Sequence, residues 1–380
     1  MITIFLIITL LLILCDSYII CGVLGVCPLW SKCLIALPAI AYIAVILYIM
    51  IARDTGQRTL NLLFWLTLCI VIPTLLFTIV SLLGKGIGLA FPAAVKTGNY
   101  IATLLSLIWI VISLYGILFG WKKIEVERVA VTSSQIPTSF NGYKIVQLSD
   151  FHIGTYATAP ECVNRIVDRV NSLNPDLIVF TGDLVNSSSD EIKEFTEILS
   201  RLHAKDGIYS VLGNHDYCLY RQYHGDDTPV KQLAEVIGYE KKIGWKVLRN
   251  ESEQIVRGND SIALIGVENA GSGAFPNKSD LKGALKGISK SEYKILLSHD
   301  PSHWRREVLP ESDIDLMLAG HTHAMQFKIG GWSPSSFVYP EWGGLYEGDG
   351  QKLYVSTGIG ENIAFRFGAW PQIVEIILHN

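Results

Sequence analysis

The first third of this 380-residue chain has almost no charge. Up to Trp121 it contains no glutamate, and its charged residues are only Asp16, Lys32, Arg53, Asp54, Arg58, Lys85 and Lys96. This scarcity argues against a soluble domain in residues 1–121, because a protein surface that faces water is rich in charged side chains. These residues instead form long apolar runs, which give the whole chain a positive mean hydropathy.

The rest of the chain lacks an excess of basic residues. Beyond position 121 it has 26 basic and 33 acidic residues, a net charge of −7. Domains that bind nucleic acid usually carry a basic patch, so we expect no nucleic acid partner. A disulfide framework is also missing, since five of the seven cysteines precede position 121 and the spacing of Cys162 and Cys218 does not suggest a pair.

The apolar runs are long enough to cross a bilayer, which takes about 20 residues per helix. Four transmembrane helices are predicted, at about residues 2–26, 34–51, 60–83 and 100–120. The first run has no basic start and no small-residue cleavage site, so we interpret it as a retained helix and not as a signal peptide. Residues 1–121 are therefore predicted to form the transmembrane region of a multi-pass membrane protein.

The connectors between the predicted spans indicate an orientation. Four basic residues, Arg53, Arg58, Lys122 and Lys123, share a side with the second domain, and Lys32, Lys85 and Lys96 lie on the other side. The side with more basic residues is usually cytoplasmic. The balance of four to three therefore predicts a cytoplasmic second domain. The sequence carries no signal for an oligomeric state.

Beyond Trp121 the pattern changes to α/β. Residues 122–142 are predicted to be a connector with an opening strand, and residues 143–380 a single domain. Short apolar runs, such as 143–148, 176–180 and 314–318, alternate with amphipathic helix-like stretches. Several of these runs end in polar loops that contain glycine. Because ligands of open α/β sheets bind outside the carboxyl ends of the strands, we expect these loops to converge.

Aspartate, asparagine and histidine side chains follow the predicted strands. They are Asp150, His152, Asp183, Asn214, His215, Asp216, His299, His321 and His323. The set offers carboxylate, imidazole and amide oxygen donors without a thiolate, which suits Mn²⁺, Fe²⁺ or Zn²⁺. There are too many donors for one tetrahedral site, but they suit two adjacent ions, an arrangement that clamps an in-line displacement at phosphorus.

The motifs and their order resemble the calcineurin-like metallophosphoesterase superfamily. They are D-x-H at 150–152, G-D at 182–183, G-N-H-D at 213–216, a strand-end histidine at 299 and G-H-x-H at 320–323. Residues 344–368 are also similar to the membrane-associated subgroup of the YkuE and YaeI type. The resemblance covers about residues 142–380. It implies a calcineurin-like αββα sandwich, which here would follow an N-terminal bundle of four transmembrane helices.

The resemblance also implies a role for each motif residue. One divalent ion would be held by Asp150, His152 and His323, the second by Asn214, His299 and His321, and both by Asp183. A hydroxide that bridges the ions would attack phosphorus. His215 would protonate the leaving oxygen, and Asp216 would orient His215.

Three further residues bear on the substrate. Arg366 is a candidate contact for a phosphate or a lipid headgroup, with a surface salt bridge as the alternative. His303 is another candidate contact, with a local capping role as the alternative. Met325 replaces the small residues that often follow G-H-x-H in related proteins, and so adds bulk beside the site.

We therefore expect a membrane-anchored phosphoesterase that hydrolyses a phosphate ester or pyrophosphate bond. The spans would keep the domain next to lipids, so the expected partners are the lipid bilayer and a phosphorylated, lipid-linked substrate. The alternative is a membrane sensor or scaffold whose phosphoesterase-like domain binds metal without turnover. Hydrolysis of a generic phosphodiester distinguishes the two.

Overall fold

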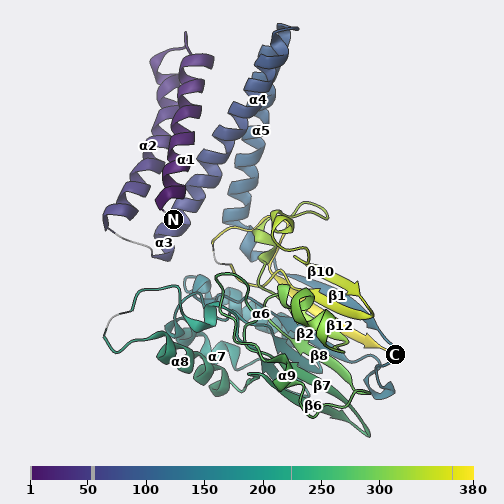
Figure 1. Ribbon diagram of the computed structural model, residues 1–380. Helices are drawn as coiled ribbons and strands as arrows, with labels where there is room; N and C mark the ends of the chain where they lie inside the picture. The colour runs from purple at the N-terminus through teal and green to yellow at the C-terminus, as the bar shows by residue number, and fades with distance from the viewer. Residues whose placement is uncertain (1, 53–55, 224, 362) are drawn as a thin grey trace. The chain divides into compact units, whose positions relative to one another are not determined.

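The computed structural model describes residues 2–52, 56–223, 225–361 and 363–380, so Arg53 of the charge count lies outside it. The chain forms two compact units (Figure 1). The first comprises residues 1–119 and 363–367, and the second comprises residues 120–362 and 368–380. The short segment 363–367 thus belongs to the first unit, although it lies close to the C-terminus in sequence.

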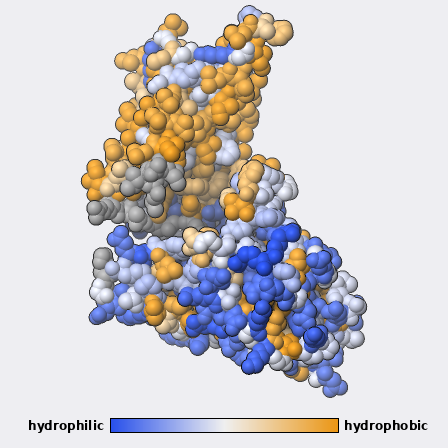
Figure 2. Space-filling view, in the orientation of Figure 1, coloured by the Kyte–Doolittle hydropathy of each residue, from blue (hydrophilic) through white to orange (hydrophobic). Residues whose placement is uncertain are grey.

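Among its described residues, the first unit contains four helical stretches that are long and apolar enough to cross a membrane, as predicted. They are Leu6–Val23, Leu29–Ala52, Arg58–Gly88 and Ala93–Leu118. Their elements are α1 (Ile2–Ser17), η1 (Tyr18–Val23), α2 (Leu29–Ala52), α3 (Gln57–Leu66), η2 (Thr67–Val71), α4 (Ile72–Gly88) and α5 (Ala93–Leu118). Figure 2 shows that hydrophobic residues dominate the visible surface of this unit, whereas hydrophilic residues dominate that of the second.

The third and fourth helical stretches, Arg58–Gly88 and Ala93–Leu118, are longer than the sequence predicted. α4 continues to Gly88 and α5 begins at Ala93, so residues 89–92 connect them and not residues 84–99. The two helices cross closely at Gly84 and Gly98, where a Cβ added to Gly84 would lie 2.9 Å from the Cα of Gly98. Small residues allow this close approach of helices in a membrane, so these glycines are a packing feature and not a helix end.

The segment 363–367 is held in the helical unit by hydrogen bonds and ring packing. The indole N–H of Trp65 donates to the carbonyl oxygen of Ala364 at 2.8 Å. The backbone N–H of Arg366 donates to the carbonyl oxygen of Gly116 at 3.2 Å. The ring of Phe365 packs against Phe64 with the centroids 6.2 Å apart. These contacts explain why segment 363–367 belongs to the helical unit.

The second unit contains two six-stranded sheets. The first has the order β1 (Glu125–Thr132), β12 (Gln372–His379), β2 (Lys144–Leu148), β3 (Leu177–Phe180), β4 (Ile208–Ser210) and β5 (Lys246–Val247). The second has the order β10 (Gly344–Gly348), β11 (Gln351–Val355), β9 (Leu316–Ala319), β8 (Tyr293–Leu297), β7 (Asp260–Gly266) and β6 (Glu251–Arg257). The run from β2 to β5 is parallel, and so is the run from β11 to β7.

Three apolar layers hold these sheets together and confirm the predicted αββα sandwich. The middle layer joins the facing sides of the two sheets and includes Ile145 and Ile295. The layer outside the first sheet is covered by α6 (Pro160–Ser172), α7 (Thr196–Leu199) and α8 (Pro229–Lys242). The layer outside the second sheet is covered by α9 (Leu281–Ala284) and η8 (Trp304–Val308). Strand residues alternate between layers, so Leu296 faces outward between two residues of the middle layer.

Candidate metal centre

The predicted ligands come together at the carboxyl ends of the parallel strands. Asp150, Asp183, Asn214, His299 and His321 lie in the loops after β2, β3, β4, β8 and β9. Among the described residues, the side chains form three groups, and within each group the donor atoms lie within 4.8 Å of one another. The groups are Asp150, His152 and His323; His152, Asp183 and His215; and Asp183, His299 and His321. Asn214 lines the same cavity as Asp183 and His321. Strand direction therefore brings residues far apart in sequence into one cluster.

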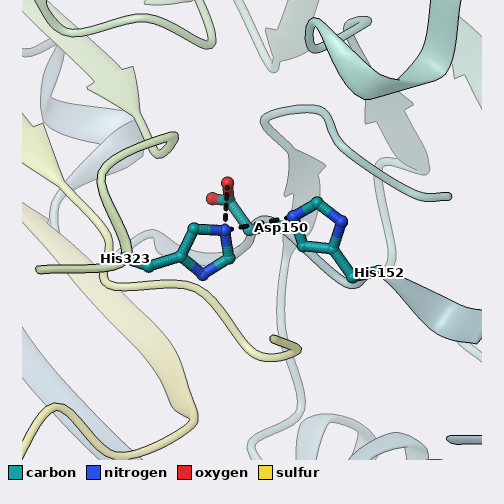
Figure 3. Close-up of side chains that lie close together, drawn as sticks. All are labelled: Asp150, His152 and His323. Atoms are coloured by element: carbon teal, nitrogen blue, oxygen red, sulfur yellow. Dashed lines mark hydrogen bonds and ion pairs between the residues drawn. The ribbon is translucent and has the colours of Figure 1, made fainter. Parts of the chain in front are cut away.

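The first predicted ion position is formed by Asp150, His152 and His323, whose side chains are buried and converge (Figure 3). Nε2 of His323 lies 3.1 Å from Nε2 of His152 and 3.3 Å from Oδ1 of Asp150. The Ser149 hydroxyl donates to Oδ2 of Asp150 at 2.6 Å and orients this carboxylate. One carboxylate oxygen and two imidazole nitrogens thus surround a single point.

The second predicted position lies around His299 and His321. Nε2 of His299 is 3.2 Å from Nδ1 of His321. The other nitrogen of each ring is occupied: Nδ1 of His299 donates to the carbonyl oxygen of Thr181 at 2.7 Å, and Nε2 of His321 lies 2.8 Å from the Tyr339 hydroxyl. Partners of this kind fix the orientation of metal-binding imidazoles, so each ring presents a defined nitrogen to the cluster.

Asp183 lies between the two positions. Its Oδ2 is 3.1 Å from Nε2 of His299 and 3.7 Å from Nε2 of His152. Its Oδ1 accepts the backbone N–H of His215 at 2.8 Å. A Cβ on Gly213 would lie 2.2 Å from Oδ1, so the loop after β4 needs glycine there to reach the carboxylate. This placement is the one that a bridging ligand requires.

The buried pair of Asp183 and His299 is strongly attractive. Burial alone would raise the pKa of Asp183, but the surrounding imidazoles lower it well below its usual range. Burial would likewise lower the pKa of His299, yet the negative charge of Asp183 raises it to about 10. A proton on His299 occupies the nitrogen that faces the cluster. A metal ion therefore competes with that proton for the same atom.

The donor set fits divalent metal ions. Oδ1 of Asn214 is buried and has no hydrogen-bond partner in the described part of the chain, whereas its Nδ2 donates to the Tyr220 hydroxyl at 2.8 Å. An unpaired buried carbonyl oxygen costs about 1–3 kcal/mol. An ion at the second position would satisfy this oxygen. Together with the converging imidazoles and carboxylates, Asn214 forms a donor set that Mn²⁺, Fe²⁺ and Zn²⁺ all accept.

His215 lies beside the cluster and lines the cavity. Its ring meets that of His152 edge-on, with the centroids 4.8 Å apart. Nδ1 donates to the carbonyl oxygen of Asn186 at 2.6 Å, which leaves Nε2 as the nitrogen able to exchange a proton with a substrate. The ring thus has the placement expected of a general acid.

Asp216 makes different contacts from those predicted. Its carboxylate accepts four backbone N–H groups, those of Asp183, Leu184, Val185 and Gly213, at 2.8, 2.8, 3.3 and 2.8 Å. The carbonyl of Asn186, and not this carboxylate, orients His215. Asp216 therefore fastens the loop after β3 to the loop after β4. These loops carry the predicted ligands Asp183 and Asn214.

The candidate substrate contact His303 makes local contacts. Both ring nitrogens of the buried His303 are engaged, with Nδ1 2.9 Å from the Ser298 hydroxyl and Nε2 3.0 Å from a carboxylate oxygen of Glu307. This geometry favours the local alternative at the start of η8 over a substrate contact. Arg366 belongs to the helical unit, and its side chain is buried. Its contact with a phosphate or headgroup stays a prediction.

Sequence reasoning missed three aromatic residues beside the cluster. The rings of Phe275 and Tyr339 pack against His321 with centroids 4.8 and 5.5 Å away, and Tyr220 covers His215 at 4.4 Å. All three lie outside the recognisable motifs, so no local pattern indicated them. A cavity of about 200 Å³ opens among Phe275, Tyr339 and the cluster, and Met325 forms part of its wall.

The backbone of several ligands is strained. Asp150, His152, Asp183, His321 and His323 have φ angles between 44° and 74°. This left-handed region costs a non-glycine residue about 1–3 kcal/mol, and such residues cluster at functional sites. The left-handed backbone continues through residues 324–326, at the end of the turn η9 (His323–Gln326). The sharp turns aim the side chains inward from the strand ends.

Known proteins resemble this chain over the region that contains the cluster. A sequence profile of the calcineurin-like phosphoesterase family matches residues 143–325. The chain is 32% identical over 340 residues to a transmembrane protein with metallophosphoesterase domain from Danio rerio. This alignment covers 86% of the chain and 75% of the relative. It is 30% identical over 266 residues to the metallophosphoesterase YkuE of Bacillus subtilis, covering 67% and 85%. It is 26% identical over 297 residues to the UDP-2,3-diacylglucosamine pyrophosphatase LpxG of Chlamydia trachomatis, covering 65% and 87%.

Proposed function

Because the chain belongs to the calcineurin-like metallophosphoesterase family, whose members are metal-dependent hydrolases, we propose that it cleaves a phosphate ester or pyrophosphate bond in a lipid-linked substrate. The observation that carries this proposal is the convergence of seven predicted metal ligands in a chain that also has four apolar helices. The relative LpxG is named for cleavage of a pyrophosphate in a diacylated nucleotide sugar, which supports the lipid-linked class.

The residues divide into two sets of ligands around a shared carboxylate. Asp150, His152 and His323 would hold one divalent ion, Asn214, His299 and His321 a second, and Asp183 both. Ions held in this way polarise the phosphoryl oxygens and supply a hydroxide nucleophile near neutral pH.

The surrounding chain performs the remaining chemistry. The carbonyl of Asn186 fixes Nδ1 of His215, so Nε2 donates the proton that the leaving oxygen needs. Tyr220 covers the ring of His215 and limits its movement. Attachment to the apolar helices keeps the site near the bilayer, which raises the effective concentration of a membrane-bound substrate. The charge of the connectors supports a cytoplasmic location of the site.

The test is turnover by the purified full-length protein with Mn²⁺ and bis(p-nitrophenyl) phosphate. The wild type should hydrolyse it, and Asp183→Asn should lose nearly all turnover because both ion positions share this carboxylate. Asp190→Asn is a matched control, since Asp190 is exposed and pairs with Lys193 at the surface. Equal turnover in all three proteins contradicts the proposed site. No turnover by the wild type at saturating Mn²⁺ favours the sensor or scaffold instead.

A further inference from the structure

A group of exposed apolar side chains lies between β9 and β10, in residues 325–339, here called the rim segment. Its exposed members are Met325, Ile329, Trp332, Phe337 and Val338, with exposed fractions of 46, 54, 45, 82 and 61%. Trp332 and Phe337 pack edge-on with their centroids 6.1 Å apart, which joins them into one surface. Contiguous apolar surface on a folded unit marks a site that binds a nonpolar group.

The rim segment is firmly attached to the fold. The buried Ser333 hydroxyl donates to the carbonyl oxygen of Ala324 at 2.6 Å and accepts the N–H of Ser335 at 3.1 Å. The N–H of Tyr339 donates to the carbonyl oxygen of Ser335 at 2.8 Å. Hydrogen bonds thus hold the backbone of the segment on the inside while apolar side chains face outward, the reverse of a loop adapted to water. The fold therefore presents these apolar side chains in a fixed arrangement.

The rim segment also forms part of the cavity at the cluster. Met325, Ser335 and Tyr339 line this cavity, and the Tyr339 hydroxyl contacts the predicted ligand His321. Val338 is the chain neighbour of Tyr339, so the apolar surface begins where the cavity wall ends. A volume of about 200 Å³ is smaller than the sites that enclose a whole ligand, about 300–1,000 Å³. The part of a substrate beyond its phosphate must lie outside the cavity.

We propose that the rim segment binds the hydrocarbon chain of the substrate while the phosphate occupies the cavity. This inference rests on the proposed function and adds the surface that binds the alkyl chain of a lipid-linked phosphate ester. Three observations favour a hydrocarbon chain as the occupant: the rim surface is apolar, it continues from the cavity wall, and the same chain carries helices apolar enough to cross a membrane. Trp332 and Phe337 are also residue types that prefer a membrane interface.

The test measures how inhibition depends on chain length. Full-length protein in nanodiscs hydrolyses bis(p-nitrophenyl) phosphate with Mn²⁺, and n-alkyl phosphates from butyl to octyl are added as inhibitors. In the wild type, the inhibition constant should fall about two- to fourfold per methylene, the effect of partial to full burial of one CH₂ group. In Phe337→Ser and Val338→Ser, the slope of the logarithm of the inhibition constant against chain length should be less than half of the wild-type slope. Because the slope compares inhibitors within one variant, a changed basal rate does not affect it.

Val256→Ser is the matched control. Val256 is 62% exposed, against 61% for Val338, and it lies on β6 at the opposite edge of the second sheet from β10. Partition of long alkyl phosphates into the nanodisc affects all variants equally, so this control should keep the wild-type slope. The same slope in all four proteins, or no slope in the wild type, overturns the inference while turnover persists. Failure of the wild type to hydrolyse the phosphodiester overturns the proposed function, and the inference falls with it.

Discussion

Asp216→Asn tests whether the loops after β3 and β4 hold the metal ligands in place. The substitution keeps the shape of the side chain but replaces one carboxylate oxygen by an NH₂ group. Each oxygen of Asp216 accepts two backbone N–H groups, and the pair on Oδ2 comes from Asp183 and Gly213, both at 2.8 Å. In the variant, one of the two pairs of N–H donors must face an NH₂ donor.

The expected loss follows from these contacts. A hydrogen bond to a charged group contributes about 1.5–3 kcal/mol, so losing two of them destabilises the joined loops by about 3–6 kcal/mol. These loops carry Asp183 and Asn214. Substitutions of residues that support metal ligands typically weaken metal affinity about 10–100-fold, and we expect an effect of that order. His215 keeps its bond to Asn186, so the imidazole should remain in place.

The assay combines thermal unfolding during a Mn²⁺ titration with the metal content of the full-length protein. Asp216→Asn should unfold at a lower temperature and require more Mn²⁺. Asp280→Asn is the control, because this exposed residue accepts the N–H of Gly283 at the start of α9, where asparagine caps equally well. His215→Ala should retain its metal content and lose turnover by about 10²–10⁴-fold.

One result would refute this reasoning. If Asp216→Asn binds Mn²⁺ and unfolds like the wild type, and shows the turnover defect of His215→Ala with a shifted pH profile, the carboxylate acts through the imidazole. The role implied by the family resemblance would then hold, and the four backbone contacts would be secondary.

Further predictions concern single ligands, a buried acid and a glycine. His321→Ala and His323→Ala should each weaken a different ion in a metal-content assay, and loss of the same ion in both would contradict the assignment. Burial raises the pKa of Glu240 to about 8 from an ordinary 4.5. The unfolded chain ionises first, so stability falls as pH rises between these values, by about 3 kcal/mol at pH 7. Glu240→Gln should therefore raise the unfolding temperature at pH 7–8 and leave it unchanged near pH 4.5; the same shift at both pH values would rule this out. In Gly360→Ala a Cβ would lie 1.7 Å from the carbonyl oxygen of Phe151, so the loop with Asp150 should shift and metal content fall, whereas wild-type metal content would argue against this contact.

The sequence was sufficient to predict which residues converge, because the argument needed only strand ends and their direction. Asp150, Asp183 and His299 each follow an apolar strand, and parallel neighbours bring their loops to one edge. The alternation of strands and helices indicated only an α/β domain, and the αββα architecture was implied by the family resemblance. The four apolar helices could be predicted from the length and hydropathy of the apolar runs alone.

Contacts between loops that are far apart in the chain could not be predicted from the sequence. The family resemblance implied that Asp216 orients His215, its neighbour in the chain, but gave no sign of the backbone N–H partners about 30 residues away. His303 shares the strand-end context of His299, and only its burial with Glu307 separates them. That acid lies four residues along a helical turn, so the i, i+4 pair was a signal that could have been used.

Hydrolysis of a lipid-linked phosphate is tested most directly by comparing the lipids of cells that carry the wild type with the lipids of cells that carry Asp183→Asn. Mass spectrometry of the two extracts should show one phosphorylated lipid that accumulates only with the variant. Incubation of that extract with the purified wild type and Mn²⁺ should consume the same species. Identical lipid profiles, together with no species consumed on incubation, would contradict the claim that this protein hydrolyses a lipid-linked phosphate.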